Sequence, residues 1–330
     1  MKIKIGDITK IRTGKLDANA ADENGQYPFF TCSKEPLKIN TYSYDCECVL
    51  VAGNGDLNVK YYNGKFDAYQ RTYIIEDDSD GLLFMPYLYF FMESYIDELR
   101  KQSIGGVIKY IKLKNLTDAL IELPSIEVQR KIVNIISKSK EIVRRKENEF
   151  ELLDELVRAR FVEMFGEIED CDKWESKIWN EVVTIKNGRD YKKVLVSDGG
   201  YPVVGTGGEI ARASKYLCPE NTIVVGRKGS INNPMLMKEK FWNVDTAFGV
   251  IPNSDYLHYQ YFYCFCKFYN FMKLNKATTL PSTTKADLLK IRINIPPLEL
   301  QNQFASFVQE IDKSRLLSNH SLFLMKSIIF

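Results

Sequence analysis

The chain has 330 residues, of which 45% are hydrophobic and 27% charged, and its formal net charge is +2. This composition is ordinary for folded globular domains, and the length is sufficient for two hydrophobic cores. The first residues carry no apolar targeting segment, and no apolar run is long enough to span a membrane. We therefore expect a cytoplasmic protein with no membrane partner.

The sequence does not indicate a metal site, a cofactor site or a catalytic site. The seven cysteines form no Cys-x-x-Cys pair, which favours free thiols in a reducing compartment. Only two histidines, His258 and His320, are present, and neither has a second ligand at metal-binding spacing. Phosphate-binding loops, nucleophile elbows and zinc-protease motifs are also missing. We therefore predict no metal, no cofactor and no catalytic residue.

The chain contains a long internal repeat. Leu-Pro-Ser-Ile-Glu-Val-Gln at 123–129 returns as Ile-Pro-Pro-Leu-Glu-Leu-Gln at 295–301, an offset of 172 (296 − 124). Further upstream, Tyr27-Pro28 matches Tyr201-Pro202, an offset of 174 (201 − 27). A period of this length exceeds that of solenoid repeats. It indicates two copies of a whole domain with a helix attached.

Each copy shows the same order of predicted elements after a glycine turn at Gly14 or Gly188 and a Tyr-Pro strand entry. The helices that end this order are so rich in aromatic residues that most of their faces are covered, which is typical of core packing. For the first and second copy respectively, we expect apolar strands at 49–52 and 223–225, glycine loops at 53–56 and 226–230, β-rich stretches at 70–75 and 246–251, and aromatic helices at 86–99 and 256–274.

A long helical pattern follows each predicted globule. Residues 129–165 contain no Gly or Pro, and their apolar residues are spaced by three, four and seven, which predicts a helix with one apolar stripe. At about 1.5 Å per residue the first helix is roughly 60 Å long, more than one domain needs, so we expect a second helix beside it. The predicted pairing residues are Ile132, Ile136, Val143, Phe150, Leu153, Val157, Phe304, Ile311 and Leu322.

These patterns predict a mixed α/β (α+β) fold class. We expect two pseudo-symmetric globular domains, at 1–124 and 167–296, separated by a pair of long antiparallel coiled-coil helices at 125–166 and 297–330. The charges of the two globules differ. Lys+Arg minus Asp+Glu is 15 − 18 = −3 over residues 1–123 and 18 − 10 = +8 over residues 173–296. The basic second globule favours a polyanionic partner, whereas the acidic first globule argues against DNA binding by both globules in the same way.

The candidate contact residues lie in the glycine turns, in the glycine loops and in the loops before each last strand. Glycines on either side of a cation let the backbone come close to a phosphate or a base edge, which the cation can then contact. Hydroxyl groups next to a Lys suit the same contacts. The simpler interpretation of any one such loop is a solvated turn. The candidates are Arg12, Lys15, Asn54, Lys109, Tyr110, Lys112, Arg189, Arg227, Lys228, Ser230, Thr279, Ser282, Thr283, Thr284 and Lys285.

Three features together resemble a known family. They are the Pro-x-x-Glu-x-Gln opening of each long helix, the segment Thr-Thr-Lys-Ala-Asp-Leu at 283–288, and Leu-Leu-Asp-Glu-Leu at 152–156 running on to Phe161 and Gly166. The duplicated unit that contains them resembles the specificity subunit of type I restriction–modification enzymes, over essentially the whole chain.

The resemblance implies that each globule is a target recognition domain for one half of a bipartite site on double-stranded DNA. It implies that the helices set the spacing and dock two methyltransferase subunits, which restriction and translocase subunits join. Catalysis would belong to those partners. Other classes remain open: the specificity partner of a type II restriction–methylation enzyme, and a coiled-coil interaction scaffold with no nucleic-acid role. A self-sufficient DNA methyltransferase is disfavoured because no cofactor motif is present.

Overall fold

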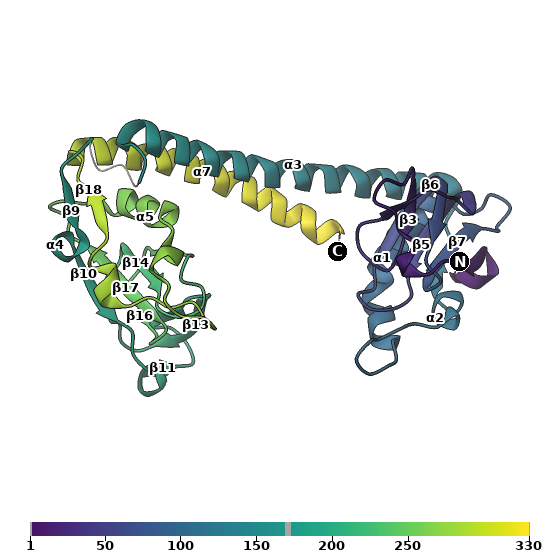
Figure 1. Ribbon diagram of the computed structural model, residues 1–330, viewed down its shortest axis with the longest axis horizontal. Helices are drawn as coiled ribbons and strands as arrows, with labels where there is room; N and C mark the ends of the chain where they lie inside the picture. The colour runs from purple at the N-terminus through teal and green to yellow at the C-terminus, as the bar shows by residue number, and fades with distance from the viewer. Residues whose placement is uncertain (1, 169–172, 330) are drawn as a thin grey trace. The chain divides into compact units, whose positions relative to one another are not determined.

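The computed structural model describes residues 2–168 and 173–329, with side chains described through residue 316 in the last helix (Figure 1). It divides into two compact units. Unit 1 comprises Met1–Arg144 with Phe323–Phe330, and unit 2 comprises Arg145–Leu322. Both units mix strands and helices, so the predicted mixed α/β class is confirmed.

Unit 1 contains a six-stranded sheet in the order β2-β7-β5-β6-β3-β4, in which only β3 and β6 are parallel neighbours. A two-stranded antiparallel pair, β1-β8, completes it. The elements are β1 (Lys2–Lys4), β2 (Thr9–Thr13), β3 (Tyr27–Phe30), β4 (Leu37–Ile39), β5 (Tyr44–Ala52), β6 (Val59–Ala68), β7 (Thr72–Asp77), α1 (Met85–Gln102), α2 (Leu113–Thr117) and β8 (Leu120–Glu122).

Both faces of strand β5 are buried, as its continuous apolar run predicts. Val49 and Val51 point into the core beneath helix α1, whereas Cys48 and Leu50 point into a second core on the opposite face. This alternation is the two-residue period of a strand. Helix α1 covers the first core with buried side chains at helical spacing, namely Leu88, Met92, Ile96 and Leu99.

Unit 2 repeats this topology with one strand broken and with one further strand, β11, at the edge. Its two sheets have the orders β10-β17-β14-β15 and β11-β13-β12-β16, beside an antiparallel pair β9-β18. The parallel pairing of Val203 with Trp242 matches that of Phe29 with Asp67, so β15 and β16 together correspond to β6. The elements are β9 (Ser176–Ile178), α4 (Trp179–Val182), β10 (Val183–Asn187), β11 (Leu195–Val196), β12 (Tyr201–Gly205), β13 (Gly208–Ala213), β14 (Thr222–Gly226), β15 (Met235–Met237), β16 (Trp242–Asn243), β17 (Ala247–Pro252), α5 (Tyr259–Phe268), α6 (Lys285–Leu288) and β18 (Arg292–Asn294).

The second aromatic helix is shorter than predicted. Instead of one helix over 256–274, helix α5 ends at Phe268 and a separate 3₁₀ turn covers Phe271–Leu274. The break lies at Asn270, whose side chain accepts a hydrogen bond from the backbone N–H of Met272. An Asn side chain that bonds the backbone in this way competes with continuation of the helix.

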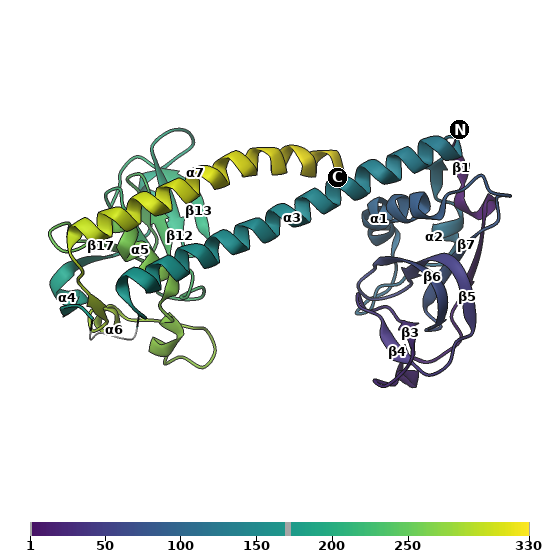
Figure 2. The same cartoon turned by 90° about the horizontal axis from the view of Figure 1, so that it is seen from above.

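The long helices are α3 (Ile126–Phe165) and α7 (Leu298–Ile329). In unit 2 the end of α3 lies beside the start of α7 (Figures 1 and 2). The ring of Phe161 packs edge-on against Phe304, with centroids 5.6 Å apart, and Asp154 bonds Arg315 at 2.8 Å. The later residue of α3, Phe161, contacts the earlier residue of α7, Phe304, and the earlier Asp154 contacts the later Arg315. The two segments are therefore antiparallel.

The structure places the predicted pairing residues as follows. Val157 and Phe304 lie in the core of unit 2, with Ile311 packed against it. Phe150 and Leu153 are half-buried, as are Ile132, Ile136 and Val143 in the part of α3 that belongs to unit 1. The side chain of Leu322 lies outside the described residues. For residues without a described partner, pairing remains a prediction.

Candidate nucleic-acid interface

Two of the predicted loops in unit 1 are joined by backbone hydrogen bonds. The N–H of Gly55 donates to the carbonyl of Lys109 at 2.9 Å, and the N–H of Ile111 donates to the carbonyl of Gly53, also at 2.9 Å. Asn54 and Tyr110 face each other between these bonds as an isolated bridge. The glycine loop and the loop over 104–112 therefore form one surface.

Unit 2 joins its corresponding loops in the same register. The N–H of Gly229 donates to the carbonyl of Pro281 at 2.9 Å, and the N–H of Thr283 donates to the carbonyl of Arg227 at 3.0 Å. Lys228 and Ser282 form the bridge. Lys228 lies 174 residues after Asn54 (228 − 54), and Ser282 lies 172 after Tyr110 (282 − 110), which are the offsets of the sequence repeat. We call these two joined surfaces the loop pairs.

Glycine is required at one position of each loop pair. Gly55 has φ +69° and Gly229 has φ +81°, a left-handed conformation that side chains rarely adopt. Each turns the chain so that its own N–H reaches the second loop. The repeat of Gly at this position in the sequence therefore reflects a shared backbone geometry.

Exposed cations surround the loop pair of unit 1. Lys15, Lys109 and Lys112 are exposed. Arg71, which the sequence analysis missed, is also exposed, and its carbonyl accepts a hydrogen bond from the N–H of Gly53 at 2.8 Å. Its counterpart in the second copy is not a cation, so the repeat gave no signal for it.

Arg12 differs from these cations because it has partners inside unit 1. Its Nε lies 2.8 Å from the carboxylate of Glu76, and its guanidinium lies over the ring of Tyr44 at 4.7 Å. The guanidinium of Arg12 is therefore already paired with groups of its own sheet, which favours a packing role over a contact with a ligand.

The basic residues of unit 2 lie at one end of its first sheet. The N–H groups of Arg189 and Arg227 donate to the carbonyls of Asn243 and Thr246, so both residues flank the same short segment. The side chains of Arg189, Arg227 and Lys228 are exposed. This end of unit 2 therefore presents cations beside a glycine loop, in agreement with the positive charge of the second globule.

The hydroxyl-rich segment mainly holds the loops in place. Thr283 is only 3% exposed and donates its hydroxyl to the carbonyl of Gly226 at 2.8 Å, so the expectation that it contacts a ligand is corrected. Thr284 caps helix α6 by accepting from the N–H of Asp287. Lys285 donates to the carbonyl of Ile185 at 2.9 Å. Ser230 and Thr279 are exposed, and Ser282 is half-buried.

The Gln of each Pro-x-x-Glu-x-Gln motif anchors a long helix to its domain. Gln301 is fully buried; its side chain accepts from the N–H of His258 at 2.8 Å and donates to the carbonyls of Tyr256 and Pro296. Gln129 makes the same three bonds in unit 1, to Phe84, Leu82 and Pro124. The motif thus has a structural reason, which the sequence alone did not give.

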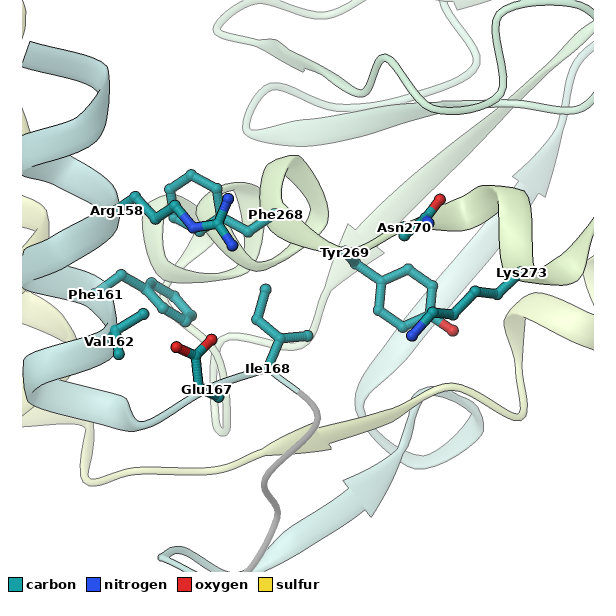
Figure 3. Close-up of a pocket in the computed structure, with 9 residues that line it drawn as sticks. All are labelled: Arg158, Phe161, Val162, Glu167, Ile168, Phe268, Tyr269, Asn270 and Lys273. Carbon is teal, nitrogen blue, oxygen red and sulfur yellow. The ribbon is translucent and has the colours of Figure 1, made fainter. Parts of the chain in front are cut away.

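Unit 2 also contains an open cavity of about 430 Å³ beside the end of α3 (Figure 3). The guanidinium of Arg158 lies 5.9 Å from the ring centre of Phe268 at its rim. The described lining residues combine aromatic, aliphatic and charged side chains. It is lined by Arg158, Phe161, Val162, Glu167, Ile168, Phe268, Tyr269, Asn270 and Lys273.

Over the described residues, no group of three or more His, Cys, Asp and Glu side chains is arranged to hold a metal ion. Within the same ranges, no helix has the length and apolar character needed to cross a bilayer. The cysteines described in the structure are free, and burial raises the pKa of the Cys218 thiol to about 12. Cys171 lies outside the described residues.

A duplicated mixed α/β unit whose two copies each present a cationic loop pair is typical of a protein that contacts an extended polyanion at two places. The comparison with protein families agrees. The sequence profile described as "Type I restriction modification DNA specificity domain" matches residues 1–152 and 171–322. The chain therefore belongs to the family of type I restriction–modification DNA specificity proteins.

Individual relatives support this assignment. Over 123 residues the chain is 45% identical to the EcoDI type I restriction enzyme specificity subunit of Escherichia coli, a match that covers 37% of the chain and 27% of that subunit. It is 22% identical over 372 residues to the MjaVIII specificity subunit of Methanocaldococcus jannaschii, covering 94% of the chain and 85% of that protein.

Solved structures share the fold at lower identity. The crystal structure of the type I restriction–modification S subunit from M. genitalium matches with a TM-score of 0.69 and 16% identity, over 100% of this chain and 93% of that one. A chain from a study of complex assembly and conformational transition in a type I system matches with a TM-score of 0.52 and 15% identity, over 100% and 95%.

Proposed function

We propose that this protein is the DNA sequence-recognition subunit of a type I restriction–modification complex. Each unit would read one half of a bipartite site on double-stranded DNA through its loop pair. The observation that carries the proposal is the repetition of the loop pair itself: the same backbone bonds join the same two loops in both units, although the side chains on them differ. One scaffold with different side chains suits two different half-sites.

The side chains of the two loop pairs suit different contacts. Arg227 and Lys228 carry full positive charges, which suit phosphate oxygens or the acceptor edge of guanine. Asn54 occupies the corresponding position in unit 1, where its amide suits the edge of adenine. The half-sites would therefore differ in sequence, and the target would be asymmetric.

In this proposal α3 and α7 set the spacing between the half-sites and form the docking surface for two methyltransferase subunits. The exposed apolar residues on α3 support a role in assembly, because apolar side chains outside a core favour contact with another protein. They include Ile135, Ile142, Leu152 and Leu156. Restriction and translocase subunits would join the same complex. Methyl transfer and cleavage would be carried out by the partners. In this proposal, residues 1–124 and 167–296 are the two target recognition domains, and residues 125–166 and 297–330 are the two spacer helices.

Methylation mapping by single-molecule sequencing tests the proposal. In cells that carry this gene with its neighbouring methyltransferase gene, we expect methylation at a split motif, and we expect both halves to be lost when this gene is deleted. Methylation that persists after the deletion would contradict the proposal. Co-purification of the chain separates a type I from a type II complex, since only the former contains separate translocase subunits.

A coiled-coil scaffold without a nucleic-acid role is the second candidate, and the acidic first globule favours it. Salt dependence separates the two. Binding that neutralises several phosphates weakens steeply as salt rises, with a slope of about −0.9 per phosphate in a plot of log K against log salt. A complex whose affinity for DNA does not change with salt or sequence would support the scaffold.

A further inference from the structure

Both units expose an apolar side chain at the same position of the loop pair. Ile108 is 64% exposed and Leu280 is 54% exposed. Their numbers differ by 172 (280 − 108), the offset that relates the loops over 104–112 and 276–284. Each directly precedes the residue, Lys109 or Pro281, whose carbonyl accepts the bond that joins the two loops. An exposed apolar side chain is therefore found at this position in both loops.

The loop that carries Ile108 is closed by local bonds. Ile104 and Tyr110 exchange two backbone hydrogen bonds, of 3.0 and 2.8 Å. Gly105 has φ +115°, and a Cβ there would lie 2.5 Å from the carbonyl oxygen of Ile108, so this turn requires glycine. The loop therefore keeps the side chain of Ile108 exposed in the absence of a ligand.

The loop that carries Leu280 is closed in a different way. The side-chain oxygen of Asn275 accepts hydrogen bonds from the N–H groups of Ala277 and Ser282, at 3.1 and 3.0 Å. These two bonds tie the beginning and the end of the loop together around Leu280. The two loops are thus closed by different hydrogen bonds, and each exposes an apolar residue at the equivalent position.

The surroundings indicate which partner would cover these residues. Ile108 is next to Lys109 in a loop that also carries Lys112. The bridge between Lys228 and Ser282 brings Arg227 and Lys228 to the loop of Leu280. An exposed apolar side chain surrounded by cations is complementary to a DNA duplex, which has phosphate anions on the outside and stacked apolar base faces on the inside. Ile and Leu are among the side chains that proteins insert between base steps, whereas contacts with thymine methyl groups commonly use Ala, Thr or Phe.

We propose that Ile108 and Leu280 are wedges that insert between stacked bases, one in each half of the DNA target. The inference rests on the proposed function and deepens it, because it assigns to each unit a residue that deforms the DNA. Unstacking is offset by burial of the apolar side chain and by the phosphate contacts of the neighbouring cations. Each half-site would then favour a flexible base step at the wedge position.

The test uses the complex of this chain with its methyltransferase subunits, bound to its mapped target. Duplexes carry 2-aminopurine at successive positions other than the methylated bases and their direct neighbours, because a methyltransferase itself unstacks the base that it modifies. The fluorescence of 2-aminopurine rises when this base is unstacked. We expect a several-fold rise at one step in each half-site. Ile108→Ser should remove the rise in one half only, Leu280→Ser in the other half only, and each should weaken binding by about tenfold.

Matched controls come from equally exposed leucines outside the loop pairs. Leu195 is 55% exposed in unit 2 and Leu82 is 63% exposed in unit 1. We expect Leu195→Ser and Leu82→Ser to leave both the fluorescence and the affinity unchanged. These variants separate the loss of a wedge from a general effect of removing an exposed apolar side chain.

Three results would overturn the inference. If a wild-type complex selects its target without any rise in fluorescence, the bases stay stacked. The wedge inference is then wrong, and the proposed function still stands. If Ile108→Ser or Leu280→Ser instead prevents assembly with the methyltransferase subunits, these side chains are protein contacts. A wild-type complex that shows no preference for the mapped target over a scrambled duplex would remove the proposed function, and with it the inference.

Discussion

The side chain of Gln301 accepts a hydrogen bond from the backbone N–H of His258 at 2.8 Å, and so connects the first turn of α7 to the start of α5. The two residues are 43 positions apart in the chain. Because Gln301 also donates to the carbonyls of Tyr256 and Pro296, one buried amide satisfies three backbone groups at a junction of two helices. The orientation of the long helix on its domain depends on this amide.

Gln301→Leu should therefore destabilise unit 2 strongly. The variant keeps a buried side chain of similar size but leaves one N–H and two carbonyls without their partner, at a cost of about 2–4 kcal/mol in the free energy of unfolding. Chemical denaturation monitored by circular dichroism measures it. The exposed Gln303 is the matched control, and we expect Gln303→Leu to change the stability by less than about 0.5 kcal/mol. Equal effects of the two substitutions would contradict the anchoring role.

Asp154 joins three helices of unit 2, since its carboxylate accepts hydrogen bonds from Lys267 of α5 at 2.7 Å and from Arg315 of α7 at 2.8 Å. Burial raises the pKa of Asp154, but the bonds from Lys267 and Arg315 outweigh this effect, so the pKa lies below its usual value. The site is about half exposed, so we expect Asp154→Asn to cost only about 1 kcal/mol.

Thermal unfolding at low and high salt tests this prediction for Asp154. The loss should be larger at low salt, where ion pairs are least screened. The neighbouring exposed residue provides the control, and Glu155→Gln should have little effect. An Asp154→Asn variant as stable as the wild type at low salt would show that the three helices pack without help from this carboxylate.

His258 makes the stability of unit 2 depend on pH. Its Nδ1 accepts a hydrogen bond from the N–H of Gln260 at 3.1 Å, which requires a neutral ring, and burial lowers its pKa below the ordinary 6.5. A folded-state pKa below the unfolded value means that this contribution is fully present above about pH 6.5 and is lost as the pH falls through the folded pKa.

His258→Asn preserves a capping side chain and removes this titration, so the melting temperature of the variant should fall less than that of the wild type between pH 7 and pH 5. The comparison uses differential scanning calorimetry. His320→Asn, which removes the other histidine, controls for general effects of histidine loss. Parallel pH profiles of wild type and His258→Asn would contradict the prediction.

Lys228→Gln should weaken DNA binding about equally for all sequences and reduce the salt slope by about one, as expected for the loss of a phosphate contact. Binding of the assembled complex to duplexes at several salt concentrations measures this slope. Arg292, exposed on β18, is the control, and Arg292→Gln should leave the slope unchanged. A change in target preference for Lys228→Gln, with no change in slope, would instead assign Lys228 to a base.

Inserting four residues after Lys146 should lengthen the gap in the DNA target. The insertion adds about one turn and roughly 6 Å to α3, close to the rise of one to two base pairs at about 3.4 Å each. Methylation mapping of cells that carry the variant reports the gap directly. An unchanged gap would show that α3 does not set the spacing.

Much of the fold could be predicted because the physical signals are local or repeated. The continuous apolar run of β5, the aromatic-rich pattern of α1 and the absence of Gly and Pro from residues 129–165 of α3 each identify an element without reference to the rest of the chain. The extent of α5 could not be predicted, because the stop at Asn270 depends on a side-chain bond to the backbone that competes with an otherwise strong aromatic pattern.

The sequence by itself determined that the chain is duplicated, that each copy combines a mixed α/β domain with a long helix, and which loops carry cations between glycines. These features follow from periodicity and composition, which need no distant contacts. Only the tertiary structure decided what the individual residues do. It joins each glycine loop to the loop before the last strand, adds Arg71 to the surface, buries Thr283 and exposes Ile108 and Leu280. The physical reason is that burial and hydrogen bonding depend on partners far away in the chain, which a residue's type and its local pattern do not specify.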